Sequence, residues 1–249
     1  MPTTYAEWRF KRYDMNKQEI KKEFEKYSIV LTEEKQEMFL IFLNTLKEYN
    51  EKFNITSIKE DNQIIEKHFI DSLMGEKCFL NGASVVEIGS GGGFPSIPLK
   101  IMREDLSFTL VESTGKKCTF LNEVKKRLGF KNFEVLNARC EDLSVKKEYR
   151  ENFTHATARA VARLNTLCEY CLPFVKVGGS FLPYKSDDEE EFKEAKKAID
   201  LLGGSFNNKI TYSIQGSMDK RCVYEIDKIK NTPDKYPRRN GKERSKPII

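Results

Sequence analysis

The stretch that most constrains the fold is 85–99, which reads VVEIGSGGGFPSIPL. Its first residues are apolar and β-branched, which is typical of a strand buried on both faces. Glycines then stand at positions 89, 91, 92 and 93. Pro95 and Pro98 follow, and proline suits the first turn of a helix. A strand, a glycine turn and a helix start in this order bring a backbone close to a nucleotide-like ligand.

The spacing of the glycines narrows the class of ligand. A dinucleotide fingerprint, G-x-G-x-x-G, would need a third glycine at position 94, which is Phe94. The chain instead reads E-x-G-x-G-x-G from Glu87 to Gly93. This pattern resembles motif I of class I S-adenosylmethionine (AdoMet) methyltransferases, in which an acidic residue closes the first strand and the glycines pack against the cofactor.

A second carboxylate supports this interpretation. Glu112 ends the apolar run 108–111 and lies 23 residues after Gly89. In nucleotide-binding α/β folds, the ribose-binding carboxylate lies about 20 residues beyond the glycines, at the tip of the next strand. A carboxylate there accepts hydrogen bonds from both ribose hydroxyls. We therefore favour a cofactor site over a glycine turn that merely joins a strand to a helix.

Composition sets the broad class. The chain has 249 residues, of which 33% are charged, and a formal charge of +5, which by itself does not indicate a nucleic-acid partner. We expect no membrane span, because no apolar run approaches about 18 residues. We also expect no signal peptide, because the N-terminal residues lack an apolar core, and we therefore expect a cytoplasmic protein. The six cysteines are expected to be free, buried thiols.

After the glycine turn, strand and helix patterns alternate, which predicts a doubly wound parallel sheet. The expected strands are Val85–Ile88, Phe108–Glu112, Phe133–Leu136, Phe153–Thr157 and Val177–Pro183, with a final antiparallel pair, Lys209–Ile214 and Cys222–Lys228. The expected helices between them are Ile97–Arg103, Lys116–Leu128, Ala160–Val175 and Asp187–Leu202. The prediction is an α/β, Rossmann-like fold with a seven-stranded sheet, the strand number of class I methyltransferases.

The two ends of the chain differ from this pattern. We expect residues 1–60 to form an aromatic, basic arm (Met1–Asp14) followed by a helical cap. We expect residues 61–232 to form the methyltransferase domain. Residues 233–249 hold six Lys or Arg against two acids. We interpret them as a basic tail that suits phosphate contacts, and expect cofactor affinity to survive its removal.

Over most of its length the chain resembles the glucose-inhibited division protein B family, also called ribosomal RNA small-subunit methyltransferase G. The matching stretches are FNITSIKEDNQIIEKHFIDSL (53–73), EIGSGGGFPSIPL (87–99), LVESTGKKCTFL (110–121), ARCEDL (138–143) and ATARAVARL (156–164). The resemblance implies AdoMet-dependent methylation of guanine N7 in small-subunit (16S) rRNA. This chain departs from the family's pattern at Gly92, where the family often has Pro, and at Ser96, where the family often has Gly.

Carried over by position, the family's cofactor contacts fall on a defined set of residues: Gly89, Phe94, Glu112, Ser113, Thr114, Cys140, Glu141 and Arg159. Guanine N7 carries a lone pair and no proton, so no general base is required. Catalysis can rest on positioning, with Arg159 as the candidate residue. We expect His155 to be structural, and favour helix packing over a supporting role for His68. Cys168 and Cys171 lack further metal ligands, so no metal is expected.

The expected partner is small-subunit rRNA or the assembling subunit, bound by a monomer. The candidate RNA-binding residues are Arg139, Arg163, Tyr184, Lys185, Arg238 and Arg239, with Tyr184 as a platform for a flipped base. Two alternatives stay open. One is a class I methyltransferase acting on a small molecule, and the other is a non-catalytic AdoMet-binding ribosome-assembly factor.

Overall fold

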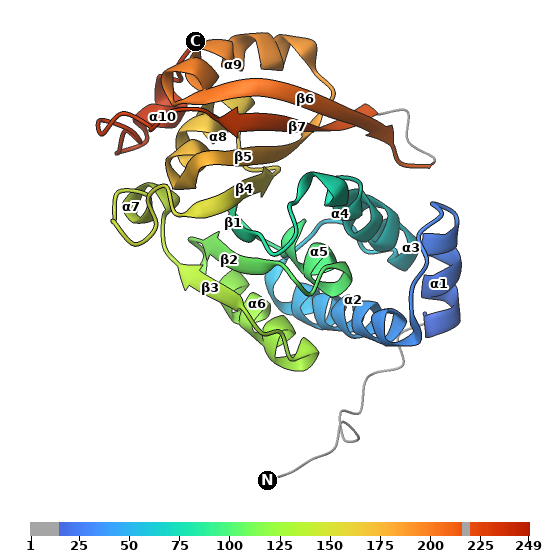
Figure 1. The fold of residues 1–249 in the computed structure, drawn as a ribbon. Helices are drawn as coiled ribbons and strands as arrows, with labels where there is room; N and C mark the ends of the chain where they lie inside the picture. Colours follow the sequence, from blue (N-terminus) through green and yellow to red (C-terminus); the bar gives the residue numbers. More distant parts are fainter. Residues whose placement is uncertain (1–14, 216–219) are drawn as a thin grey trace.

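A seven-stranded sheet organises the chain (Figure 1). The computed structural model describes residues 15–215 and 220–249. The strand order is β3-β2-β1-β4-β5-β7-β6, with β1 to β5 parallel and β7 antiparallel to both neighbours. The strands are β1 (Ser84–Ile88), β2 (Ser107–Glu112), β3 (Phe133–Asn137), β4 (Phe153–Arg159), β5 (Val175–Ser186), β6 (Gly204–Ser213) and β7 (Lys220–Lys228). The predicted doubly wound α/β fold and its closing antiparallel pair are confirmed.

Helices cover the sheet. The first set is α1 (Lys17–Glu25), α2 (Glu33–Phe53), α3 (Asp61–Ile64), a π-helix (Ile65–Ile70), α4 (Asp71–Leu73), a 3₁₀ turn (Glu76–Cys78), α5 (Ser96–Met102) and α6 (Gly115–Leu128). The second set is α7 (Cys140–Leu143), α8 (Leu164–Cys171), a 3₁₀ turn (Leu172–Phe174), α9 (Glu189–Leu201) and α10 (Lys242–Ser245). The four-residue helices α7 and α10 were not predicted, because so short a segment shows no periodicity.

The helix predicted over Ala160–Val175 is shorter in the structure. It begins only at Leu164, and Val175 already pairs with Phe153 of β4 as the first residue of β5. Pro173 lies in the 3₁₀ turn between them. The apolar run that suggested a continuous helix is therefore divided between a helix and a buried strand, two structures that periodicity alone does not separate.

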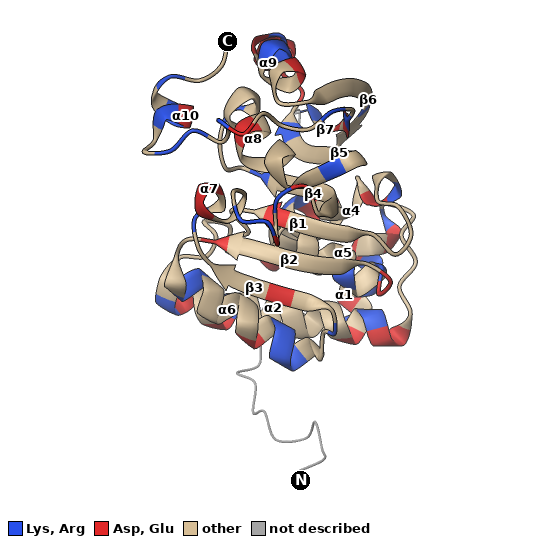
Figure 2. Cartoon of the chain, turned by 60° about the vertical axis from the view of Figure 1, so that its left-hand side comes forward, with Lys and Arg blue, Asp and Glu red and all other residues tan. Residues whose placement is uncertain are grey.

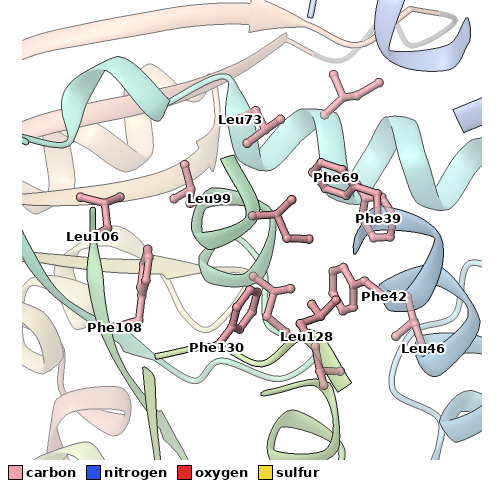
Figure 3. Close-up of a cluster of buried hydrophobic side chains, with 14 of the residues drawn as sticks. Phe39, Phe42, Leu46, Phe69, Leu73, Leu99, Leu106, Phe108, Leu128 and Phe130 are labelled. Atoms are coloured by element: carbon pink, nitrogen blue, oxygen red, sulfur yellow. The ribbon is translucent and has the colours of Figure 1, made fainter. Parts of the chain in front are cut away.

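The two faces of the sheet bury two hydrophobic clusters. Side chains alternate along a strand, so in β1 Val85 joins the first cluster, while Val86 and Ile88 join the second. The first cluster lies under α1, α2, α5 and α6, and Figure 3 shows part of it, with both phenylalanine and leucine side chains. The second lies under α7, α8 and α9. The result is a three-layer α/β/α arrangement.

The N-terminal helices pack directly on the methyltransferase fold. The side chain of Asn16 caps α1 and that of Thr32 caps α2. The rings of Phe42 and Phe69 stack with centroids 4.9 Å apart (Figure 3). The helical cap therefore shares one hydrophobic core with the sheet. The arm predicted over Met1–Asp14 lies outside the described residues.

The strand order places the functional region. It reverses between β1 and β4, where β2 and β3 extend to one side and β5, β7 and β6 to the other. In open α/β sheets, ligands bind outside the carboxyl ends of the strands at such a switch point. The glycine turn follows β1 and Arg159 ends β4, so both lie at this point. Within the described ranges, no helix is long and apolar enough to cross a membrane.

Candidate active site

The glycine turn after β1 needs glycine for conformation and for space. Gly89 and Gly91 have φ of 67° and 52°, in the left-handed region that side chains disfavour. A Cβ on Gly89 would lie 2.6 Å from Cγ2 of Val161. The Gly89 amide donates to the carbonyl oxygen of Val111 at 2.8 Å, which fixes the turn against β2.

Glu112 joins the turn to the tip of β2. One carboxylate oxygen accepts from the Gly91 amide at 2.9 Å, and the other accepts from the Thr114 amide at 2.8 Å. The side chain is buried. Each carboxylate oxygen has more than one acceptor position, so Glu112 can hold the turn and still accept from ribose hydroxyls.

A cavity of about 350 Å³ opens beside these residues, a size suited to a small ligand. Gly89 and Ser113 line it from the ends of β1 and β2. Cys140 and Glu141, at the start of α7, line it from the region after β3. The Cys140 thiol donates to a Glu141 carboxylate oxygen at 3.1 Å, and burial raises the pKa of that thiol. Four of the predicted cofactor residues are thus brought together around one cavity.

The C-terminal segment forms part of this cavity, which the sequence did not predict. Gly241, Glu243 and Arg244 line it together with Tyr170 of α8. Figures 1 and 2 show α7, α8 and α10 near one another. The segment is therefore not a free basic tail, and the expectation that cofactor affinity survives its removal stays a prediction.

An ion pair explains why the C-terminal segment docks. Glu169 is the single charged residue in the apolar stretch 164–174, and it is buried. The guanidinium of Arg238 binds its carboxylate through Nη2 at 2.6 Å and Nε at 2.9 Å. Buried carboxylates are nearly always paired with a cation. The position of Glu169 in an apolar stretch therefore indicated that it has a cationic partner, but did not indicate which residue that partner is. The guanidinium of Arg238, which was predicted to contact RNA, is instead occupied by this ion pair.

Arg159 and Asp71 form a second cluster beside the switch point. Asp71 is 1% exposed, and one of its carboxylate oxygens lies 3.0 Å from Nη1 of Arg159. The other accepts from Nη1 of Arg221 and from the hydroxyl of Tyr212, each at 2.9 Å. Nη2 of Arg159 also donates to the carbonyl oxygen of Lys67, in the π-helix. The fork of Arg159 is therefore held in place by protein groups.

Phe94 and His68 extend this cluster. Their rings stack with centroids 4.4 Å apart, and the guanidinium carbon of Arg159 lies 5.8 Å from the Phe94 centroid. Nε2 of His68 lies 2.8 Å from Oγ1 of Thr56. Burial, together with the charge of Arg159, lowers the pKa of His68 to about 3. His68 is therefore neutral at physiological pH and packs as a polar aromatic ring.

Glu87, the acid of the glycine motif, is fully buried, and Ser96 lies beside its carboxyl group without forming a hydrogen bond of good geometry. Desolvation raises the pKa of Glu87 to about 8. The group is thus protonated at neutral pH in the ligand-free protein.

The residues predicted to contact RNA differ in accessibility. Arg139, Arg163 and Arg239 are exposed, although Arg163 pairs with Glu194 at 2.6 Å. Lys185 is half-buried and pairs with Glu191 at 2.6 Å.

The structure corrects the prediction for Tyr184. Its side chain is 3% exposed and its hydroxyl donates to the carbonyl oxygen of Ser72 at 2.7 Å. The ring lies against Gly75, where an added Cβ would contact the Tyr184 hydroxyl. It is therefore unavailable to stack on a flipped base, because the segment after α4 covers this part of β5.

The cysteines and His155 behave as packing residues. All six thiols are free and buried. Burial raises the pKa of Cys171 well above its usual range, so the thiol is not poised for reaction. Nε2 of His155 accepts from the Leu80 amide at 3.1 Å, which supports a structural role. Across residues 15–215 and 220–249, no group of three or more His, Cys, Asp or Glu is arranged to hold a metal ion.

Comparison with known proteins identifies the family. The model of rRNA small subunit methyltransferase G matches residues 35–217. The chain is 41% identical over 232 residues to ribosomal RNA small subunit methyltransferase G of Clostridium perfringens (strain 13 / Type A), covering 92% of this chain and 97% of the relative. It is also 41% identical over 240 residues to the protein of that name from Lactobacillus helveticus, covering 94% and 100%.

Solved structures share the fold. One is TYW2 from M. jannaschii in complex with AdoMet, with a TM-score of 0.51 and 16% identity over 64% of this chain and 77% of the other. Another is a SAM-dependent methyltransferase from Aquifex aeolicus, with a TM-score of 0.50 and 16% identity over 66% and 92%. These structures agree with the fold that the glycine motif predicts, and the family model and the relatives show that the chain belongs to the rRNA small subunit methyltransferase G family.

Proposed function

We propose that this protein transfers the methyl group of AdoMet to guanine N7 in the small-subunit (16S) ribosomal RNA. The observation that carries the proposal is its membership of the family over nearly the whole chain. Named homologues share this activity class, and the fold places a cofactor-sized cavity at the switch point of the sheet. The enzyme is proposed to act as a cytoplasmic monomer.

The residues around the cavity fit AdoMet. Gly89 lets the backbone approach the ligand, since even a Cβ would crowd Val161. Glu112 retains acceptor positions for the ribose hydroxyls, and Glu141 offers carboxylate oxygens for the purine amino group. Ser113 and Cys140 complete the walls. When bound, the cofactor supplies an electrophilic methyl group on a sulfonium.

The reaction asks little acid–base chemistry of the protein. Guanine N7 presents an in-plane lone pair and no proton, so in-line attack on the methyl carbon needs no general base. The neutral His68 fits this requirement as a packing group. The proposed role of the chain is to hold the two reactants in line, and orientation alone can lower a barrier by several kcal/mol. Arg159 is rigidly placed for such a role by Asp71 and Lys67.

Replacing Glu112 with alanine is expected to weaken AdoMet binding by about 1.5–3 kcal/mol, because charge-assisted hydrogen bonds to the ribose are lost. Titration calorimetry on ligand-free protein measures this directly. Glu134→Ala is the matched control, since Glu134 lies on the neighbouring strand β3 with an exposed side chain. Equal affinities of the two variants for AdoMet would show that Glu112 does not bind the cofactor.

Mapping of methylated guanine in rRNA tests the function itself. Small-subunit rRNA from cells with and without the gene is digested and analysed by mass spectrometry, and the purified enzyme is then added to the unmodified RNA. We expect one N7-methylguanine to be absent without the gene and restored by the enzyme. Restoration of growth or assembly without any methylated base would favour the assembly-factor alternative. Turnover of a small molecule with no change in RNA would favour the other alternative.

A further inference from the structure

The C-terminal segment 233–248 closes one wall of the cavity that the proposed function assigns to AdoMet. We infer that Arg244 contacts the purine end of the cofactor, and that Tyr170 and Glu243 are positioning residues that hold Arg244 in place. This inference rests on the proposed position of the cofactor. Arg244 thereby adds to the proposed cofactor site a purine-contacting residue from a part of the chain outside the glycine motif.

The position of Arg244 relative to the cofactor follows from the order of residues around the cavity. Gly89 and Ser113 lie at the ends of β1 and β2, where the ribose carboxylate Glu112 stands. Cys140 and Glu141 follow β3, one strand further out, which is the purine side. Arg244 lines the same cavity as Glu141, and α10, which carries Arg244, lies near α7, which carries Glu141 (Figures 1 and 2). Arg244 therefore stands on the purine side of the cavity.

Specific contacts hold Arg244 there. Its Nε donates to the Tyr170 hydroxyl at 3.1 Å, and that hydroxyl donates to a Glu243 carboxylate oxygen at 3.0 Å. The guanidinium carbon lies 5.8 Å from the centroid of the Tyr170 ring. The carbonyl oxygen of Glu243 accepts from Thr166 Oγ1 at 3.0 Å, which fixes the backbone of α10 on α8.

The burial of Glu243 shows that α10 packs on the fold, while the side chain of Arg244 lies exposed at the edge of the cavity that it lines. Glu243 is 1% exposed, and its second carboxylate oxygen has no partner within the described part of the chain. A buried, half-satisfied carboxylate is costly unless something completes its environment. The guanidinium beside it keeps donors in a planar fork that also stacks on aromatic faces. A purine ring placed between this guanidinium and the wall formed by α7 would offer an aromatic face for stacking and polar edges for hydrogen bonds.

The acidic and basic groups complement each other across the segment. Figure 2 shows acidic positions on α7 and α8 near the basic stretch around α10. Arg238 clamps the segment through Glu169, and Arg150 donates to the carbonyl oxygens of Thr232 and Tyr236 at 2.7 and 3.0 Å. The segment is thus docked at several points along its length, and Arg244 is presented from a fixed backbone.

Three single variants and one double variant test the inference by calorimetry with AdoMet, S-adenosylhomocysteine and adenosine. Arg244→Ala removes the contact, and Tyr170→Phe removes only the hydroxyl that holds it. Lys242→Ala is the matched control, because Lys242 is an exposed cation of the same helix, α10, and does not line the cavity. We expect Kd to rise roughly tenfold for Arg244→Ala with all three ligands, since all carry the purine. Tyr170→Phe is expected to give a smaller rise, and the double variant no more than Arg244→Ala alone, because the two act as a unit.

Hydrogen exchange gives a second readout. By linkage, a ligand that contacts the segment must also stabilise its docking. We expect AdoMet to slow amide exchange in 238–246 of the wild-type protein and to slow it less in Arg244→Ala. Wild-type affinity in Arg244→Ala overturns the inference and leaves the proposed function standing. An effect on AdoMet but not on adenosine also overturns it, because the contact would then lie away from the purine. Failure of the wild-type protein to bind AdoMet would instead refute the proposed cofactor site.

Discussion

Replacing Asp71 with alanine is expected to lower the free energy of unfolding by about 3–5 kcal/mol, the range for removing one partner of a buried ion pair. The carboxylate of Asp71 is almost completely buried and bridges two guanidinium groups, those of Arg159 and Arg221. It also accepts from the Tyr212 hydroxyl. Without it, two partly buried cations repel each other and a buried hydroxyl loses its acceptor.

Urea unfolding of wild-type and variant proteins measures this effect. Asp71→Asn keeps an acceptor for Tyr212 but removes the charge, so its loss of stability is attributable to the two arginines. Asp187→Ala is the matched control, since Asp187 forms a more exposed pair with Lys209 at 2.8 Å. Pairs of that kind contribute about 0–1 kcal/mol. If Asp71→Ala costs no more than Asp187→Ala, the cluster does not support the fold.

Asp71 also orients Arg159, the residue proposed to position the reactants. Arg159 emerges from β4 at the switch point, and Asp71 fixes its orientation from the N-terminal side of the chain. The sequence placed both residues in matching family stretches, and it identified Arg159 as a candidate. It did not reveal Arg221, because β7 comes beside β5 only through the order of the sheet.

Local features were predictable because their physics is local. The glycine turn, the strand before it and Glu112 all lie within one β-turn-α-β unit, so spacing alone brought the carboxylate to the turn. The parallel strands and the closing antiparallel pair followed from the alternating pattern along the chain, whereas the order of the strands in the sheet was not predicted.

The parts that were missed depend on contacts between distant segments. Arg238 meets Glu169 across 69 residues, so a stretch that is basic by composition becomes a wall of the cavity. Tyr184 was expected to face a substrate, but Ser72 and Gly75 cover it from a segment more than 100 residues away. In both cases the side chain's exposure was decided by packing that composition does not specify.

Glu87 is expected to make the stability of the ligand-free protein strongly dependent on pH. Its pKa is raised from 4.5 to about 8, because its carboxyl group is fully desolvated. Between these values the folded state keeps the proton while the unfolded state releases it. The folded state then binds more protons, so the free energy of unfolding falls as pH rises, by up to about 1.4 kcal/mol per pH unit. This contribution is fully present below pH 4.5 and is lost as pH rises through about 8.

Glu87→Gln isolates this effect, because the amide has nearly the shape of the protonated carboxyl group and does not ionise. Urea unfolding of both proteins at several pH values between 5 and 9 gives the difference in stability at each pH. We expect wild type to lose stability relative to Glu87→Gln as pH rises toward about 8, and the difference to level off above it. Glu134→Gln, on the exposed side of β3, should run parallel to wild type throughout. A constant difference between wild type and Glu87→Gln would mean that Glu87 is ionised in the folded protein throughout this pH range, and that the favourable charge of Arg159 outweighs desolvation.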